Sequence, residues 1–187
     1  MENAIFEEKK VSKAYMKLSL PLVLSMTVSL IYNLADTFFV AQTQNTNIVA
    51  GVSLCAPLFT TLMALGNIFG QGGSSLISRL LGKNDTTATR RVSAFCFWGA
   101  ILIGVLMGFI MLLFRTPLLY VIGANEETFN FARDYYTWLA IGAPALVLSF
   151  IHSNLLRSEG MSKESMIGTM GGAIVNILLD PIFISVL

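Results

Sequence analysis

The sequence predicts an all-α integral membrane protein, a polytopic helical bundle with five transmembrane helices. Hydrophobic residues make up 55% of the chain, charged residues only 12%, and the mean hydropathy is positive; soluble domains do not have this composition. Long uncharged runs, such as 92–114, reach the roughly 20 apolar residues that cross about 30 Å of hydrocarbon. Because these runs are continuous rather than alternating, they predict helices and not barrel strands.

Five spans can be placed along the chain. They cover residues 18–40, 49–72 with an apolar extension to 77, 92–114, 136–156 and 166–187. Residues 1–17 are expected to form a cytoplasmic segment, and residues 18–187 one transmembrane bundle. The first span is too long for the apolar region of a signal peptide, which is about 7 to 15 residues. In the short connection 82–91, Asp85 is expected to be the N-cap of the next helix.

Basic residues are distributed unevenly between the two sides of the membrane. Ten of the 12 lysines and arginines fall in the N-terminal segment and in the connections after the second and fourth spans. These ten are Lys9, Lys10, Lys13, Lys17, Arg79, Lys83, Arg90, Arg91, Arg157 and Lys163. The positive-inside rule therefore predicts a multi-pass protein of the inner (cytoplasmic) cell membrane with its N-terminus in the cytoplasm.

The end of the chain differs from that of a typical complete membrane protein. Five spans with a cytoplasmic start would place the C-terminus outside, and no polar residue follows the last apolar run, which ends at Leu187. We therefore expect the sequence to be a fragment of a larger protein.

Two carboxylates fall inside the predicted spans, Asp36 in the first and Asp180 in the fifth. An ionisable side chain at membrane depth costs about 2.5 to 3.5 kcal/mol or more, so it marks a functional site by default. At 1.5 Å per residue, Asp36 lies about 27 Å and Asp180 about 21 Å along its span from the cytoplasmic side. If the two helices pack together, both acids can face one cavity. The alternative is that they only hold helices together, or that Asp36 reaches the outer interface.

Polar neighbours accompany each acid on its own helical face. Tyr32 and Asn33 precede Asp36 by four and three residues, and Asn176 precedes Asp180 by four. In a weakly polar site, desolvation and a neighbouring like charge both favour the protonated form of one carboxyl group. Such a pair could hold a proton or another small cation and release it when water enters.

Prolines accompany both acids. Pro181 follows Asp180 directly and cannot donate to the carbonyl of Ile177, and Pro21 in the first span has the same effect on the carbonyl of Lys17. Pro21 is therefore either a hinge in the first helix or a proline tolerated in a first turn.

Other candidates favour structural roles. The small-residue face GNIFGQGG at 66–73, and the glycines of the third span, predict close helix packing. His152 is more simply explained by a hydrogen bond than by proton relay. Cys55 and Cys96 are expected to be buried thiols, with no disulfide and no metal site. No enzyme motif is present, so we expect no catalysis, no cofactor and no nucleic-acid partner.

Several stretches together resemble the N-terminal half of the multidrug and toxic compound extrusion (MATE) family. They are PLVLSMTVSLIYNLADTFFVAQ at 21–42, GQGGSSLISRLLGKND at 70–85, LLRSEGMSKES at 155–165 and NILLDPIFI at 176–184. The resemblance runs over nearly the whole chain. It implies a lobe of a twelve-helix transporter that exports cationic or amphipathic small molecules across the lipid bilayer in exchange for protons or sodium ions.

The resemblance also implies roles for single residues. It places a cation-coupling site on Asp36 and Asp180, with Tyr32 and Asn176 in the same network, and it links Pro21 to bending of the first helix.

Two further positions are implied less directly. Tyr135 is the best-spaced match for a tyrosine of the fourth helix, with Tyr136 beside it, and Asn154 is a candidate substrate-binding residue.

The family's sixth helix and C-terminal bundle have no counterpart in these residues, so this chain alone is not expected to transport. Two rival interpretations remain. A lipid or lipid-linked oligosaccharide flippase of the same superfamily would need basic residues in its cavity, and none lies within the predicted spans. A non-transporting membrane scaffold would not need the two acids.

Overall fold

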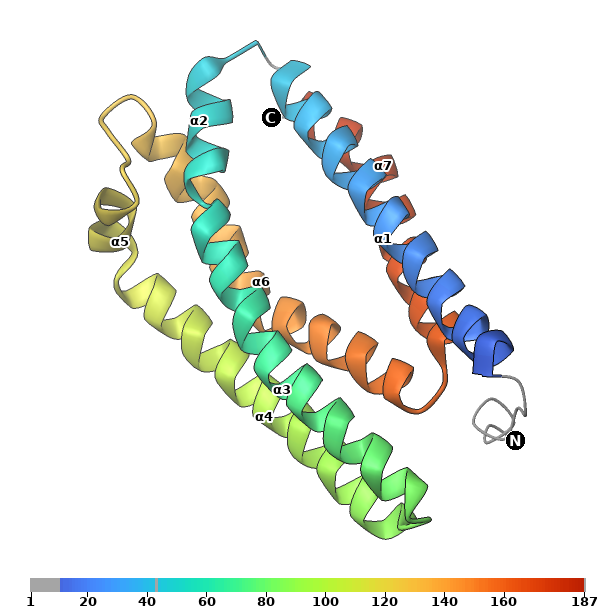
Figure 1. The fold of residues 1–187 in the computed structure, drawn as a ribbon. Helices are drawn as coiled ribbons and strands as arrows, with labels where there is room; N and C mark the ends of the chain where they lie inside the picture. Colours follow the sequence, from blue (N-terminus) through green and yellow to red (C-terminus); the bar gives the residue numbers. More distant parts are fainter. Residues whose placement is uncertain (1–10, 43, 187) are drawn as a thin grey trace.

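The computed structural model describes residues 11–42 and 44–186, and this part of the chain is folded almost entirely into helices (Figure 1). They are α1 (Val11–Gln42), α2 (Thr46–Leu54), α3 (Ala56–Gly82), α4 (Thr86–Leu113), α5 (Arg115–Val121), α6 (Phe129–Ser158) and α7 (Ser162–Val186). The predicted all-α class is confirmed. Asp85 is the N-cap of α4, as predicted, because its Oδ1 accepts a hydrogen bond of 2.9 Å from the backbone N–H of Ala88.

Four segments of the described chain are long and apolar enough to cross a membrane. They are Tyr15–Phe39, Thr46–Gly82, Thr86–Leu113 and Phe129–Ser158. The predicted count of five is one higher. The difference lies in the fifth predicted span, 166–187, which falls on α7 and continues past the described side chains.

The second predicted span is divided into two helices, which the sequence analysis did not expect. Cys55 separates α2 from α3 and has φ −82° and ψ −7°. Pro57 stands in the first turn of α3 and has no amide hydrogen to donate to the carbonyl of Ser53, so one uninterrupted hydrogen-bond ladder cannot run through this point. The short helix α5 was also not predicted, because its seven residues lie in a connection.

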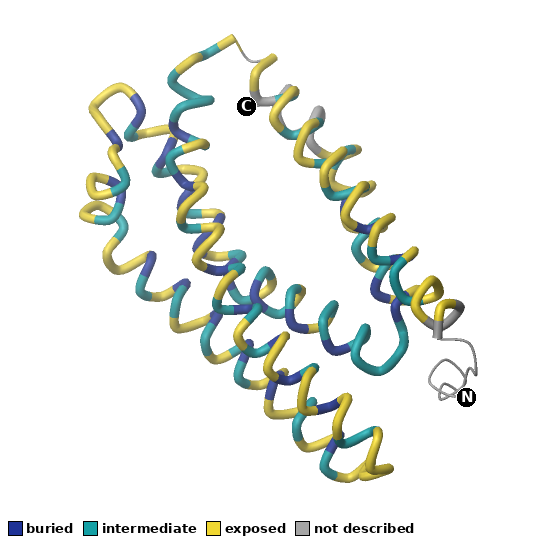
Figure 2. Tube along the Cα trace, in the orientation of Figure 1, coloured by how far each residue is buried: buried dark blue, intermediate teal, exposed yellow. Residues whose placement is uncertain are grey.

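The core of the molecule is formed where α6 packs against α3 and α4. Figure 2 shows buried positions gathered along these helices, whereas α1 is exposed along most of its length. The largest fully buried side chains include Tyr136, Leu62, Ile77 and Leu119. Both cysteines are buried, as predicted.

Glycines on α3 allow this close packing. A Cβ atom added at Gly70 would lie 2.8 Å from Nδ2 of Asn154 on α6, and one at Gly73 would lie 2.5 Å from Sγ of Cys96 on α4. These distances are shorter than real Cβ contacts. The predicted packing role of the 66–73 face is confirmed.

The approach of α4 to α6 is similarly close and brings backbone against backbone. A Cβ atom at Gly104 would lie 2.5 Å from the Cα atom of Pro144, and one at Gly108 would lie 2.6 Å from the carbonyl oxygen of Ala140. Pro144 cannot donate a hydrogen bond to that same carbonyl, which lies four residues before it in α6. The glycines of α4 therefore fit against α6 at the turn where its own hydrogen-bond ladder is interrupted.

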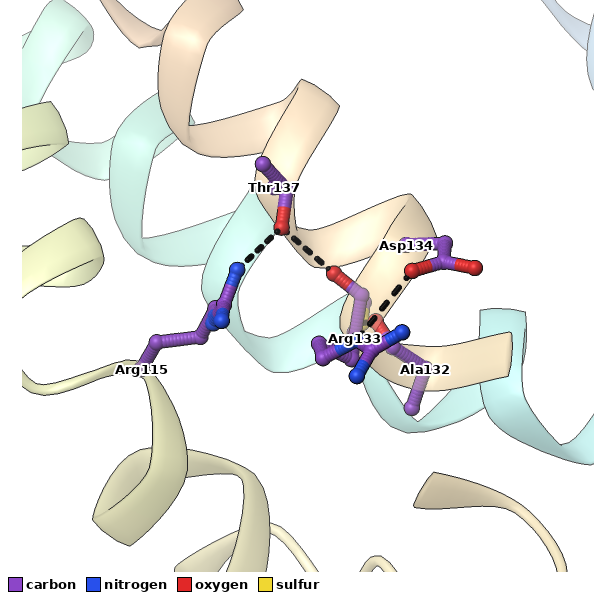
Figure 3. A network of polar contacts seen from close by, with 6 residues as sticks. Arg115, Ala132, Arg133, Asp134 and Thr137 are labelled. Carbon is purple, nitrogen blue, oxygen red and sulfur yellow. Dashed lines mark hydrogen bonds and ion pairs between the residues drawn. The ribbon is translucent and has the colours of Figure 1, made fainter. Parts of the chain in front are cut away.

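The α5–α6 region is joined by a small polar network (Figure 3). Nη1 of Arg115 donates to Oγ1 of Thr137 at 3.3 Å, and this hydroxyl donates to the carbonyl of Arg133 at 2.7 Å. Arg133 also forms an ion pair with Asp134 at 3.2 Å, but both side chains are largely exposed, so this pair adds little stability.

Tyr136 links α6 to the end of α4 inside the core. Its buried hydroxyl donates a hydrogen bond of 2.6 Å to the carbonyl of Met111, one of the last carbonyls of α4. Since such carbonyls have no partner within their own helix, the tyrosine satisfies a group that would otherwise be buried and unpaired.

We expect the substitution Tyr136→Phe to lower the free energy of unfolding by about 1–3 kcal/mol, because it leaves the Met111 carbonyl buried without this donor. Tyr120 is exposed, so Tyr120→Phe is the matched control and should change stability little. Thermal unfolding of the purified protein in detergent measures both. Equal melting temperatures for the two variants would contradict the role given to the hydroxyl.

Candidate functional site

The helices that carry the two predicted acids lie side by side. α1 packs against α7, and Figure 1 shows both running in the same direction, with their C-terminal ends at the same end of the molecule. Asp36 belongs to the last turns of α1, and the backbone of Asp180 to the last turns of α7. The helix packing that a shared acidic site requires is therefore present. The Asp180 side chain lies outside the described part of the chain, so its pairing with Asp36 stays a prediction.

Asp36 is half-buried and lies within electrostatic range of Tyr135 on α6. These residues are 99 positions apart in the sequence, and α6 packs mainly against α3 and α4. The fold therefore places the acid of α1 within electrostatic range of the tyrosine predicted from the sequence, and their shared site stays a prediction. Tyr32 is half-buried on α1 and Asn176 exposed on α7, within the same helix pair.

Asn33 stands three residues before Asp36 on α1 and forms hydrogen bonds with its own helix. Its Nδ2 donates to the carbonyl of Ser29 at 2.8 Å, and its own carbonyl accepts from Oγ1 of Thr37 at 2.8 Å. Asn33 also lines a groove between α1, α6 and α7, together with Arg157. Asn33 is thus engaged with its own helix and borders this groove.

Pro21 is buried inside α1 and not in its first turn. The helix begins at Val11, ten residues earlier, so the first-turn interpretation is wrong. The carbonyl of Pro21 accepts a hydrogen bond of 2.9 Å from Oγ of Ser25. The hinge remains a prediction, because α1 is one continuous helix in this structure.

Asn154 belongs to α6 and contacts α3. Its Nδ2 donates to Oδ1 of Asn67 at 3.3 Å and to the carbonyl of Phe150 at 2.8 Å. The amide therefore takes part in helix packing beside Gly70, and its predicted contact with substrate stays a prediction. Asn67 was not predicted as a site residue, although a lone amide in an apolar run is a detectable signal.

Arg157 is the second residue that the sequence analysis missed. It was assigned to a cytoplasmic connection, but it lies in the last turn of α6 and is half-buried. The predicted spans hold no basic residue, but the helix is longer than its predicted span at both ends, so Arg133 and Arg157 both lie in the candidate span Phe129–Ser158.

Comparison with known proteins identifies the family. The family model described as MatE matches residues 21–182 of this chain, a region that includes Asp36, Tyr135 and Asp180. The chain belongs to the MatE family. The resemblance to MATE transporters inferred from the sequence motifs is confirmed.

Curated relatives of this MatE chain are described as export proteins. It is 35% identical over 179 residues to "Multidrug export protein MepA" of Staphylococcus haemolyticus and equally identical to the protein of that description from Staphylococcus aureus. In both cases the match covers 96% of this chain and 40% of the relative. The chain thus spans two-fifths of the length of these relatives.

Solved structures of the family share the fold. The MatE chain matches a structure described as the outward-facing conformation of a multidrug resistance MATE family transporter, with a TM-score of 0.85 and 32% identity over 90% of this chain and 37% of that one. A transporter structure from Pyrococcus furiosus described as having a binding pocket of reverse polarity matches with the same values. These relatives are described as export proteins and transporters.

Proposed function

We propose that this chain is the N-terminal lobe of a cation-coupled multidrug efflux transporter, with Asp36 and Asp180 as the site of the coupling ion. The observation that carries the proposal is the parallel packing of α1 on α7, which brings both acid-bearing segments to the same end of the molecule. Tyr135 on α6 lies within electrostatic range of Asp36 and is a further polar group for this site. Tyr32 and Asn176 complete the proposed network, and the coupling ion is a proton or a sodium ion.

In the proposed cycle, the carboxylates alternate between an ion-loaded and an empty state. Binding of a proton or sodium ion relieves the repulsion between the two carboxylates, and this favours one arrangement of α1 relative to α7. Pro21 would allow α1 to bend between the two arrangements. Export requires that the substrate bind these arrangements with different affinities, since a ligand without differential affinity shifts no equilibrium.

The proposal includes a second bundle and a defined orientation. Alternating access needs two bundles that move around a central site, so the C-terminal bundle of the same transporter is the expected partner. The N-terminus would lie in the cytoplasm, with the protein in the inner cell membrane. The substrates would be cationic or amphipathic small molecules, as proposed from the export function named for the MepA relatives.

Ethidium transport tests this proposal. Proteoliposomes that contain the full-length transporter are loaded with ethidium, and either a pH gradient or a sodium gradient is imposed. One of the two gradients should drive dye movement, which identifies the coupling ion. Movement of a fluorescent phospholipid analogue without dye transport would favour a flippase instead, and no movement of either under both gradients would favour a scaffold.

A further inference from the structure

A groove of about 370 Å³ opens between α1, α6 and α7, in the half of the molecule that holds the α6–α7 connection. It is lined by Ser25, Met26, Ser29, Leu30, Asn33, Arg157 and Thr169. This position is separate from Asp36, which does not line it. Among these lining residues Arg157 alone is charged.

Within the described chain, the guanidinium of Arg157 is held by a hydrogen bond from its Nε atom alone. Its Nε donates to Oγ of Ser165 on α7 at 3.2 Å, and that hydroxyl donates to the carbonyl of Ser153 at 3.2 Å. Within the described chain, no carboxylate forms an ion pair with Arg157 and no residue accepts a hydrogen bond from its Nη atoms. A half-buried, fixed arginine of this kind is a site for an anionic group such as a phosphate.

The groove also offers hydrogen-bond acceptors on α1 and α7. Oγ of Ser25 donates to the carbonyl of Pro21, Oγ of Ser29 to that of Ser25, and Oγ1 of Thr169 to that of Ser165, each at 2.9 Å. A hydroxyl group has only one hydrogen to donate, so the remaining capacity of these oxygens is to accept. A ligand that satisfies them must carry N–H or O–H donors.

Arg157 and these hydroxyls together fit a ligand with an anion at one end and hydrogen-bond donors near it. Met26 and Leu30 add apolar contact, and both are exposed on α1. Arg157 lies one residue before the end of the candidate span Phe129–Ser158, and long basic side chains near the ends of spans extend toward the headgroup region. We propose that this groove binds the headgroup of a phosphatidylethanolamine molecule, with the phosphate on Arg157 and the ammonium on the hydroxyl oxygens of α1 and α7.

The N–H donors make the proposal specific and testable. Phosphatidylcholine has the same phosphate and the same charge, but its quaternary ammonium has no hydrogen to donate. The purified protein in nanodiscs with equal amounts of both lipids is extracted into detergent, and the lipids that remain bound are measured by mass spectrometry. Because no ion gradient is applied, the result does not depend on the proposed coupling function.

We expect phosphatidylethanolamine to be retained about tenfold over phosphatidylcholine, and Arg157→Gln to lower this retention about tenfold, since each loss removes a charge-assisted hydrogen bond. Arg157→Lys should keep most of the retention, which separates loss of charge from misfolding. Ser29→Ala should lower the preference for phosphatidylethanolamine over phosphatidylcholine.

Each test variant has a matched control: Arg79→Gln for the change at Arg157, and Thr27→Ala for the change at Ser29. Arg79→Gln removes an exposed arginine at the end of α3, and Thr27→Ala removes an α1 hydroxyl that also bonds its own helix but does not line the groove. Both should retain the lipid as the unmodified protein does. Equal retention of the two lipids, or full retention by Arg157→Gln, would overturn the proposal. Competition by soluble glycerophosphoethanolamine as effective as that of the lipid would assign the site to a free phosphate ester.

Discussion

Replacing Asp36 by Asn in the full-length transporter is expected to abolish gradient-driven ethidium efflux. Asparagine has nearly the same size and can still form hydrogen bonds, but it can neither take up a proton nor neutralise a sodium ion. The ion-loaded and empty states of residue 36 would then no longer exist, so the ion gradient could not shift the equilibrium between the two arrangements. The initial efflux rate should fall by about 100-fold, within the range that coupling free energies of 1–3 kcal/mol allow.

Asp85→Asn is the matched control for this loss. It removes the same charge from the same chain, but at the exposed N-cap of α4, where asparagine is as good a cap as aspartate. Its efflux rate should equal that of the unmodified transporter. An Asp36→Asn variant with a normal rate, at equal amounts of protein in the membrane, would eliminate Asp36 from the coupling site.

The second large effect is expected at Gly104, where α4 meets α6. The position has no room for a side chain, because even a Cβ atom would lie 2.5 Å from Cα of Pro144 and 3.3 Å from the carbonyl oxygen of Ala143. These are backbone atoms, which cannot move aside as the end of a flexible side chain can. Gly104→Leu should therefore separate α4 from α6 and destabilise the protein by about 3 kcal/mol or more.

Gly142→Leu is the control, since a Cβ atom at Gly142 on α6 would meet nothing within 4 Å. Thermal unfolding in detergent, followed by size-exclusion chromatography, reports the fraction of folded monomer for both variants. We expect Gly104→Leu to lose the folded fraction at temperatures at which Gly142→Leu keeps it. If the two variants unfold together, the close α4–α6 contact does not control stability.

Much of the fold could be predicted from the sequence, for a definite physical reason. In hydrocarbon each backbone N–H and C=O group must bond within its own helix, so a continuous apolar run of sufficient length already determines its local structure. The segment 136–156 is found inside α6, and the segment 92–114 falls on α4 except for its last residue, which is the C-cap. Asp85 could be recognised as an N-cap because capping depends on residues close in the sequence.

The candidate site was predicted in part. Asp36 was detectable because a carboxylate is rare in an apolar span, and this argument needs no knowledge of the fold. Asn67 and Arg157 were not recognised, because their roles depend on partners in other segments. Asn67 pairs with Asn154, 87 residues away, and Arg157 reaches Ser165 across the α6–α7 connection.

The sequence by itself determined that this chain is a helical membrane protein and which acids lie within its spans, since both follow from the composition of single segments. Only the tertiary structure decided that α7 is the neighbour of α1, that α4 approaches α6 at Gly104, and that Arg157 borders a groove with α1 hydroxyls. The reason is that a transmembrane helix has several apolar faces, and each of them could contact either lipid or another helix. Which face meets which helix depends on the shapes of side chains that are far apart in the sequence.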